Sequence, residues 1–124
     1  MNKTTFIKKD IEKPISVFDI DINILKEFFI KVYSYRSYRL ENYWKWLYRV
    51  DFLSKKNPIV FLKNNKIAGH MGLIPFWLNV EGKKVTAAWY ADLFVQPEFR
   101  AQGIANKITE ELMKLTDVHL SFGN

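Results

Sequence analysis

The stretch DLFVQPEFRAQGIANKI, residues 92 to 108, decides how the rest of this sequence is interpreted. An apolar run ends at a proline turn, an arginine and a glycine follow, and apolar residues then recur at helical spacing. The first N–H groups of a helix lack intrahelical partners and carry the positive end of the helix dipole. A glycine there admits phosphate oxygens to the backbone, and Arg100 adds a charge. The stretch therefore predicts an anion site, better suited to a diphosphate than to a single carboxylate.

Two amphipathic helices are expected before this stretch. In residues 18 to 36, apolar side chains repeat every three or four positions, and Asp19 or Asp21 is placed to cap the start. A second helix is expected over residues 41 to 52. Its apolar stripe consists of Tyr43, Trp44, Leu47 and Val50.

The pattern then changes from helical to extended. Strands are expected near residues 59 to 63, 66 to 80 and 85 to 95, separated by the hairpin-turn sequences KNNK and EGKK. Pro75 cannot donate to a ladder, so it predicts a bulge or a sheet edge. The third run, VTAAWYADLFV, is nearly all apolar, which predicts a strand buried on both faces.

A last helix and a further strand complete the pattern. The helix begins after Gly103 and carries the apolar stripe Ile104, Ile108, Leu112 and Leu115. The segment DVHLSFGN then begins like another strand. The order of elements predicts a mixed α/β (α+β) fold with a central, mostly antiparallel sheet.

Composition limits the kind of protein. With 124 residues, 48% of them apolar, the chain is expected to form one domain over residues 1 to 124. A net charge of +6 favours anionic partners without selecting among nucleic acid, phosphorylated cofactors and lipid. The absence of cysteine excludes disulfides and thiolate chemistry, and the two histidines lack acidic neighbours at ligand spacing, so no metal is expected. With no signal peptide and no apolar run of spanning length, we expect a cytoplasmic protein without a membrane partner.

The stretch 92 to 108 resembles the acetyl-CoA-binding motif of the GNAT superfamily of N-acetyltransferases. The family pattern Q/R-x-x-G-x-G/A falls on Arg100, Gly103 and Ala105, with Val95, Pro97 and Phe99 in their usual places. The order of elements is also similar to the first two thirds of that three-layer fold. The resemblance implies an acyltransferase that moves an acetyl group from acetyl-CoA to an amine acceptor in a ternary complex.

The resemblance also implies the residues that contact the cosubstrate. The main-chain amides of the loop would hold the pyrophosphate, and the strand before it would pair with the pantetheine arm. A backbone N–H of the strand would polarise the thioester carbonyl as the amine attacks. The expected cofactor-binding residues are Leu93, Phe94, Val95, Arg100, Ala101, Gln102, Gly103, Ile104 and Ala105.

Asp92 is the one acidic residue in the apolar strand. In the family a carboxylate near this point acts as base or holds the substrate amine, which makes Asp92 the candidate catalytic residue. The alternative is an Asp that caps a turn or pairs with a surface cation. Tyr90 should share its strand face and either line the acceptor groove or pack.

The family continues past the strand that starts near Val118 with a helix and two strands, so the resemblance implies a domain truncated at its C-terminal end. Activity of such a chain, its acceptor and a homodimeric state stay open. One alternative is a catalytically silent module that binds CoA or a protein. Another is a nucleic-acid-binding domain that uses Lys31, Arg36, Arg39, Lys45 and Arg49, for which a solvated helical face is the simpler interpretation.

Overall fold

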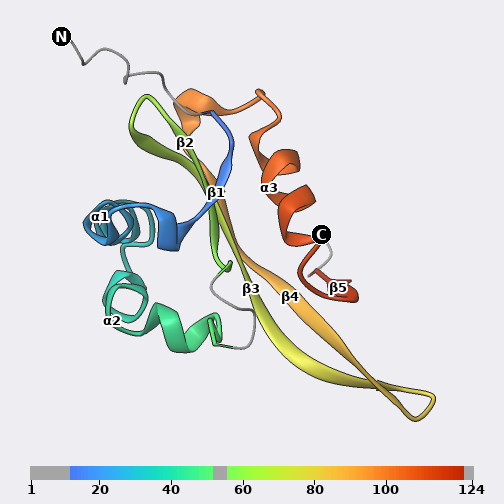
Figure 1. Cartoon of the computed structure of the whole chain (residues 1–124). Coiled ribbons are helices and arrows are strands. Elements are labelled where there is room, and N and C mark those ends of the chain that lie inside the picture. Colours follow the sequence, from blue (N-terminus) through green and yellow to red (C-terminus); the bar gives the residue numbers. More distant parts are fainter. Residues whose placement is uncertain (1–11, 52–55, 122–124) are drawn as a thin grey trace, which may run out of the picture.

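The computed structural model describes residues 12–51 and 56–121. A five-stranded sheet runs in the order β1-β2-β3-β4-β5, antiparallel throughout except for the parallel pair β4 and β5 (Figure 1). The elements are β1 (Pro14–Ser16), α1 (Ile22–Val32), α2 (Ser37–Leu47), β2 (Ile59–Lys63), β3 (Lys66–Val80), β4 (Lys83–Val95), α3 (Ile104–Leu112) and β5 (Val118–Leu120).

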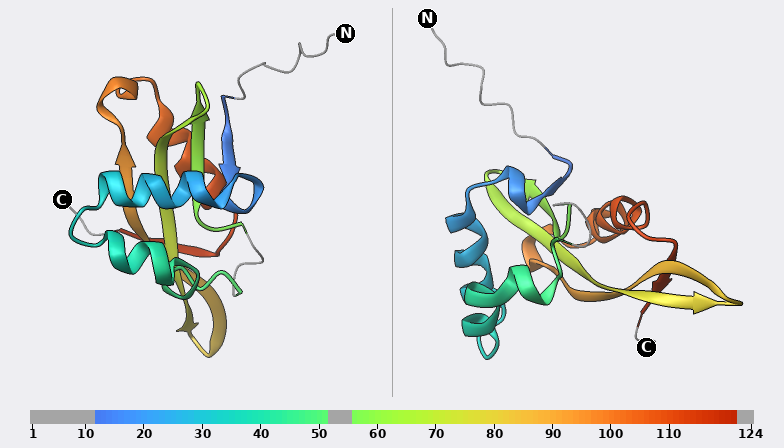
Figure 2. Two further views of the ribbon diagram at one scale, coloured as in Figure 1. Left: turned by 90° about the vertical axis from the view of Figure 1, so that its left-hand side faces the viewer. Right: turned by 60° about the horizontal axis from the view of Figure 1, so that its bottom comes forward.

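Helices α1 and α2 cover one face of the sheet and α3 covers the other (Figure 2). Each face has its own apolar core. One core joins the sheet to α1 and α2 through Leu25, Phe29, Leu40 and Trp44, and the other joins it to α3 through Ile104, Ile108 and Leu112. The predicted mixed α/β fold with a mostly antiparallel sheet is confirmed.

The first helix has the predicted face and cap. The Asp21 carboxylate accepts a hydrogen bond from the Asn23 N–H at 2.9 Å, which satisfies one of the free donors at the start of α1. Leu25, Phe28 and Phe29 are buried against the sheet.

The second helix differs from its prediction. It spans Ser37–Leu47 rather than residues 41 to 52, and the predicted end at residue 52 lies outside the described residues. The backbone of Tyr43 is non-helical (φ −129°, ψ 17°), so the helix is kinked there, and Leu40 and Trp44 form the buried stripe. Tyr43 itself is 53% exposed, so of the predicted stripe within α2 only Trp44 is fully buried.

The two long strands form a hairpin that extends beyond the helices (Figure 1). The bounds predicted for β2 and β3 are confirmed, and β4 begins two residues earlier than expected. Pro75 pairs with Ala88 on the part of β3 that lies past its pairing with β2, which confirms the predicted edge position. The prediction that β4 is buried on both faces holds only in part. Its residues pack in both cores, but only Ala87 and Ala88 are fully buried.

Gly69 sets the distance between α3 and the sheet. A Cβ atom at this position would lie 2.9 Å from the Ile104 Cγ2 atom and 3.2 Å from the Ile108 Cδ1 atom. Glycine therefore lets the start of α3 pack directly on β3, which places the loop before α3 beside the end of β4.

Candidate functional site

The loop between β4 and α3 leads into a helix start, where backbone N–H groups lack intrahelical partners. A short 3-10 turn at Pro97–Phe99 follows the strand, and Ala101 and Gly103 have positive φ angles of 64° and 76°. The Lys107 N–H donates to the Gly103 carbonyl at 3.1 Å, and this is the first hydrogen bond of the α3 ladder. The three N–H groups from Ile104 to Asn106 precede it and have no carbonyl partner within the helix.

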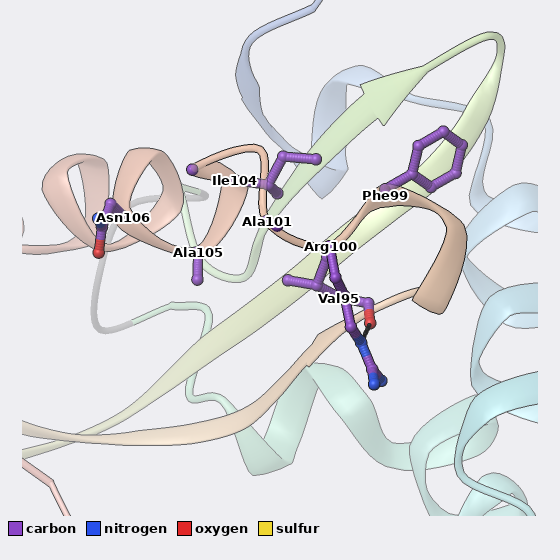
Figure 3. A pocket seen from close by; sticks show the side chains of 8 residues that line it. Val95, Phe99, Arg100, Ala101, Ile104, Ala105 and Asn106 are labelled. Atoms are coloured by element: carbon purple, nitrogen blue, oxygen red, sulfur yellow. Dashed lines mark hydrogen bonds between the residues drawn. The ribbon is translucent and has the colours of Figure 1, made fainter.

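A pocket of about 310 Å³ lies at this helix start (Figure 3). A Cβ atom built on Gly103 would meet no atom within 4 Å, so the glycine leaves open space next to the free N–H groups. Such a cradle fits a diphosphate, whose oxygens accept from backbone donors at the positive end of the helix dipole. The pocket is lined by Val95, Phe99, Arg100, Ala101, Gly103, Ile104, Ala105 and Asn106.

Two side chains hold the loop in place. The Arg100 Nε–H donates to the Val95 carbonyl at 2.7 Å, drawn as a dashed line in Figure 3, and the guanidinium lies 5.2 Å from the Phe94 ring centroid. The Gln102 side chain accepts from the Lys63 ammonium at 2.7 Å. The Arg100 side chain is thus held against the end of β4, by Val95 and the Phe94 ring. Gln102 is tied to the β2–β3 turn rather than to the pocket.

A second pocket, of about 250 Å³, lies further back along β4. The β4–β5 pairing ends at Trp89 and Leu120, and the pocket occupies the space beyond this point. Both pockets are lined in part by β4, the first by Val95 and the second by Tyr90 to Leu93. The lining residues are Met71, Tyr90, Ala91, Asp92, Leu93, Thr109 and Ser121.

A β-bulge lies beside the second pocket. His70 pairs with Phe94 and Gly72 pairs with Ala91, so Met71 alone faces both Asp92 and Leu93. Asp92 takes the left-handed conformation, with φ 58°, which Asp tolerates better than most residues. Bulges of this kind re-aim side chains and are frequent next to active sites.

The bulge reverses which residues face which helices. Tyr90 and Val95 pack in the α3 core although they are five residues apart, and Phe94 packs against α1 and α2. The Asp92 carboxylate is bound by Arg36 and Tyr48, on the α2 side of the sheet. The prediction that Tyr90 and Asp92 share a face was therefore wrong. Tyr90 lies against the His119 ring of β5, with centroids 5.7 Å apart.

Both carboxylate oxygens of Asp92 accept hydrogen bonds. The Arg36 guanidinium donates to both, the contact of its second nitrogen being 3.2 Å, and the Tyr48 hydroxyl donates at 2.5 Å. Burial alone would raise the pKa of Asp92, but the bonds from Arg36 and Tyr48 outweigh it, and the pKa lies below its usual value. Asp92 is therefore an ionised carboxylate paired with a cation, the alternative that the sequence left open.

The carbonyl of Asp92 is bound as well. It accepts from the Tyr33 hydroxyl at 2.6 Å and lies 2.9 Å from the His70 Nδ1 atom, which must carry the hydrogen because a carbonyl only accepts. His70 is completely buried among the rings of Phe28, Phe29 and Tyr48, and burial lowers its pKa to about 4. At neutral pH it is an uncharged donor.

Four residues of this site were missed by the sequence reasoning: Tyr33, Arg36, Tyr48 and His70. Arg36 was assigned to a solvated basic face, and the two tyrosines to helical segments without a role of their own. The one available signal was a histidine in an apolar strand with glycines at positions 69 and 72, because glycines leave room for close packing. That neither histidine binds a metal stays a prediction. Among residues 12–51 and 56–121, no group of three or more His, Asp or Glu side chains is placed to bind a metal.

Comparison with known proteins identifies the family. Residues 18–118 match the family described as Acetyltransferase (GNAT) domain, and the chain therefore belongs to the GNAT acetyltransferases. No curated protein matches. The expectation drawn from Arg100, Gly103 and Ala105 is confirmed at the level of the family.

Solved structures share the fold at low sequence identity. Glucosamine-6-phosphate N-acetyltransferase from Arabidopsis thaliana is 13% identical with a TM-score of 0.66, over 92% of this chain and 83% of that one. A predicted acetyltransferase with acetyl-CoA from Clostridium acetobutylicum is 12% identical with a TM-score of 0.58, over 94% and 82%. A GCN5-related N-acetyltransferase from Kribbella flavida is 17% identical with a TM-score of 0.57, over 85% of this chain, which spans only 26% of its length.

None of the helices in the described part of the chain is long and apolar enough to cross a membrane.

Proposed function

We propose that the chain is an N-acetyltransferase domain that uses acetyl-CoA to acetylate an amine acceptor by direct attack. The observation that carries the proposal is the pocket at Arg100 to Ala105, where glycine leaves open space beside free N–H groups. Family membership supports acyl transfer from CoA as the class of reaction.

In this proposal acetyl-CoA occupies both pockets, which are lined by Val95 and by Leu93 of the same strand. The amides of Ile104, Ala105 and Asn106 would bind the pyrophosphate, with Arg100 as a charged partner. The backbone of Leu93 to Val95 would pair with the pantetheine arm. The reacting end would then reach the second pocket, beside the bulge at Asp92.

In the chemical step, the acceptor nitrogen bonds to the thioester carbonyl carbon as the carbon–sulfur bond breaks. The nitrogen gives up a proton and the departing sulfur takes one, so atoms and charge balance. Negative charge develops on the carbonyl oxygen, and the Leu93 N–H is the strand donor that we assign to it. A preorganised donor of this kind acts without reorganising during the reaction.

The sequence makes Asp92 the candidate base, but the hydrogen bonds that its carboxylate accepts oppose that role. A carboxylate with lowered pKa and two bound donors is a weak base. To accept a proton from the amine, Asp92 would have to release Arg36 or Tyr48. The same observation favours a second candidate function, a silent module that binds CoA without transferring the acetyl group.

The nucleic-acid alternative is weakened by Arg36, one of its five basic residues, whose guanidinium is bound to Asp92. The solvated basic face stays the simpler interpretation of the others.

The proposal is tested by calorimetric titration with CoA, acetyl-CoA and pantetheine. We expect CoA and acetyl-CoA to bind with similar affinity, and pantetheine at least tenfold more weakly because it lacks the diphosphate. Thiol release from acetyl-CoA with a panel of primary amines then separates the enzyme from the silent module. Equal affinity for pantetheine and CoA would show that the loop does not bind the diphosphate.

A further inference from the structure

Four side chains from three separate parts of the chain converge on one residue of the bulge. Tyr33 follows α1, Arg36 precedes α2, Tyr48 follows α2, and His70 lies on β3. All four donate hydrogen bonds to Asp92, two to its carboxylate and two to its carbonyl. We call these four residues the bulge clamp.

The carbonyl contacts fix a peptide plane. The Asp92 carbonyl points toward α1 and α2, since the Tyr33 hydroxyl and the His70 ring both donate to it. A trans peptide is planar, with the N–H opposite to the C=O. The Leu93 N–H therefore points away from the clamp, toward the side of the sheet on which Thr109 of α3 lines the second pocket.

The carboxylate contacts fix the backbone on the other side of the same residue. The Asp92 side chain is 8% exposed, and its planar pairing with the Arg36 guanidinium is further oriented by Tyr48. A left-handed Asp in a strand is uncommon and persists where surrounding contacts enforce it. Here the side chain and the carbonyl are both restrained.

Local features of the sequence serve this contact. Gly72 lets the Tyr48 ring lie directly on β3, because a Cβ atom at that position would be 2.5 Å from the Tyr48 Cε1 atom. His70 is buried with its Nε2 atom unpaired among the described residues, while its Nδ1 atom donates to the Asp92 carbonyl. Leaving a buried polar atom unpaired costs free energy. Buried polar groups are normally satisfied, so an exception of this kind calls for an explanation.

We propose that the bulge clamp consists of positioning residues that aim the Leu93 N–H at the thioester carbonyl and join the α1–α2 layer to the strand that binds acetyl-CoA. Asp92 then acts through its backbone. Its carboxylate is bound by Arg36 and Tyr48, and these contacts fix the backbone conformation. The inference rests on the proposed function and goes beyond it by giving these side chains a role.

The test follows the Leu93 amide by ¹H–¹⁵N NMR in the presence of saturating CoA or acetyl-CoA. In the parent chain, we expect the Leu93 signal to differ between the two complexes, because only acetyl-CoA offers a thioester carbonyl. Tyr33→Phe and Tyr48→Phe each remove one hydroxyl and keep the ring. In both variants the difference should fall by at least about half, while the Kd for CoA stays within about threefold because the diphosphate loop is a separate site.

Tyr38→Phe is the matched control. Tyr38 is 65% exposed and pairs with Tyr43 rather than with Asp92, so its variant should keep the Leu93 difference of the parent. Arg36→Gln provides a third variant at a half-exposed position, for the case in which loss of a buried hydroxyl unfolds the chain. Arg36→Lys should restore part of the signal that Arg36→Gln loses.

The outcomes separate the two proposals. If the parent binds CoA and the clamp variants keep the full Leu93 difference, the clamp has no positioning role and the proposed function stands. If Leu93 does not distinguish the two complexes in the parent, the clamp does not serve the thioester. If the parent binds neither ligand, the proposed function fails, and the clamp inference with it.

Discussion

The buried histidine makes the stability of the fold depend on pH. The pKa of His70 is lowered from 6.5 to about 4 by burial, so the unfolded chain binds a proton below pH 6.5 that the folded chain does not. Stability is therefore full above pH 6.5 and falls as the pH drops toward 4. At roughly 1.4 kcal/mol for each pKa unit, the loss between pH 7.5 and pH 4.5 should be roughly 2 to 3 kcal/mol.

Urea unfolding followed by tryptophan fluorescence at pH 7.5, 6.5, 5.5 and 4.5 measures this loss. Trp44 is buried in the core between the sheet and helices α1 and α2 and reports the transition. Asp92, whose pKa is lowered, loses its own contribution only below its ordinary value of 3.8, so it does not act in this window.

His70→Asn is the matched variant, because its amide can donate to the Asp92 carbonyl and does not titrate. We expect it to be less stable at pH 7.5, since a smaller side chain leaves a void, but to lose much less stability on acidification. The reasoning is refuted if the parent shows no loss between pH 7.5 and 4.5, or if His70→Asn loses as much.

Three further predictions concern the supports of the site. Asn57→Ala should destabilise the chain by about 3 kcal/mol or more in urea unfolding, because the Asn57 amide makes three buried bonds of 2.7 to 2.8 Å to the Tyr48 and Leu73 backbone; an effect below about 1 kcal/mol would contradict this. Gly72→Ala should displace the Tyr48 ring, costing about 1 to 3 kcal/mol and changing the near-ultraviolet circular dichroism, and an unchanged spectrum would argue against close packing there. Arg100→Ala should weaken CoA binding by about 1 to 3 kcal/mol by calorimetry, whereas an unchanged Kd would remove Arg100 from the site.

The sequence was sufficient where local pattern and local contacts agree. The strands at 59–63 and 66–80 and the start of α3 were predicted because alternation, turn residues and helical spacing coincide there. The loop residues Val95, Arg100, Ala101, Gly103, Ile104 and Ala105 line one pocket, since a contiguous segment needs only the strand-to-helix geometry to be brought together.

The rest depended on contacts between distant segments. Helix α2 begins at Ser37, before its predicted start, so its buried residues are Leu40 and Trp44 and not Tyr43. Helical periodicity also does not predict the kink at Tyr43. The bulge at Asp92 reversed the alternation of β4. The prediction failed there because a strand pattern assumes that side chains alternate strictly between the two faces. Arg36 lies 56 positions from Asp92, and nothing local to either residue indicates the pair.

The central claim is that the loop before α3 binds the CoA diphosphate. Gly103→Glu tests it most directly, because its side chain would enter open space at the free N–H groups with a charge of the same sign as the phosphates.

Gly103→Ala is the control. It shares the cost of a non-glycine residue at φ 76°, about 1 kcal/mol, but adds only a methyl group. Calorimetric titration of the parent and both variants with CoA, beside circular dichroism to verify folding, gives the decisive comparison. The account predicts that Gly103→Glu folds and does not bind CoA while Gly103→Ala retains measurable binding. Binding of CoA to Gly103→Glu with the affinity of the parent would contradict it and leave the glycine a role in starting the helix alone.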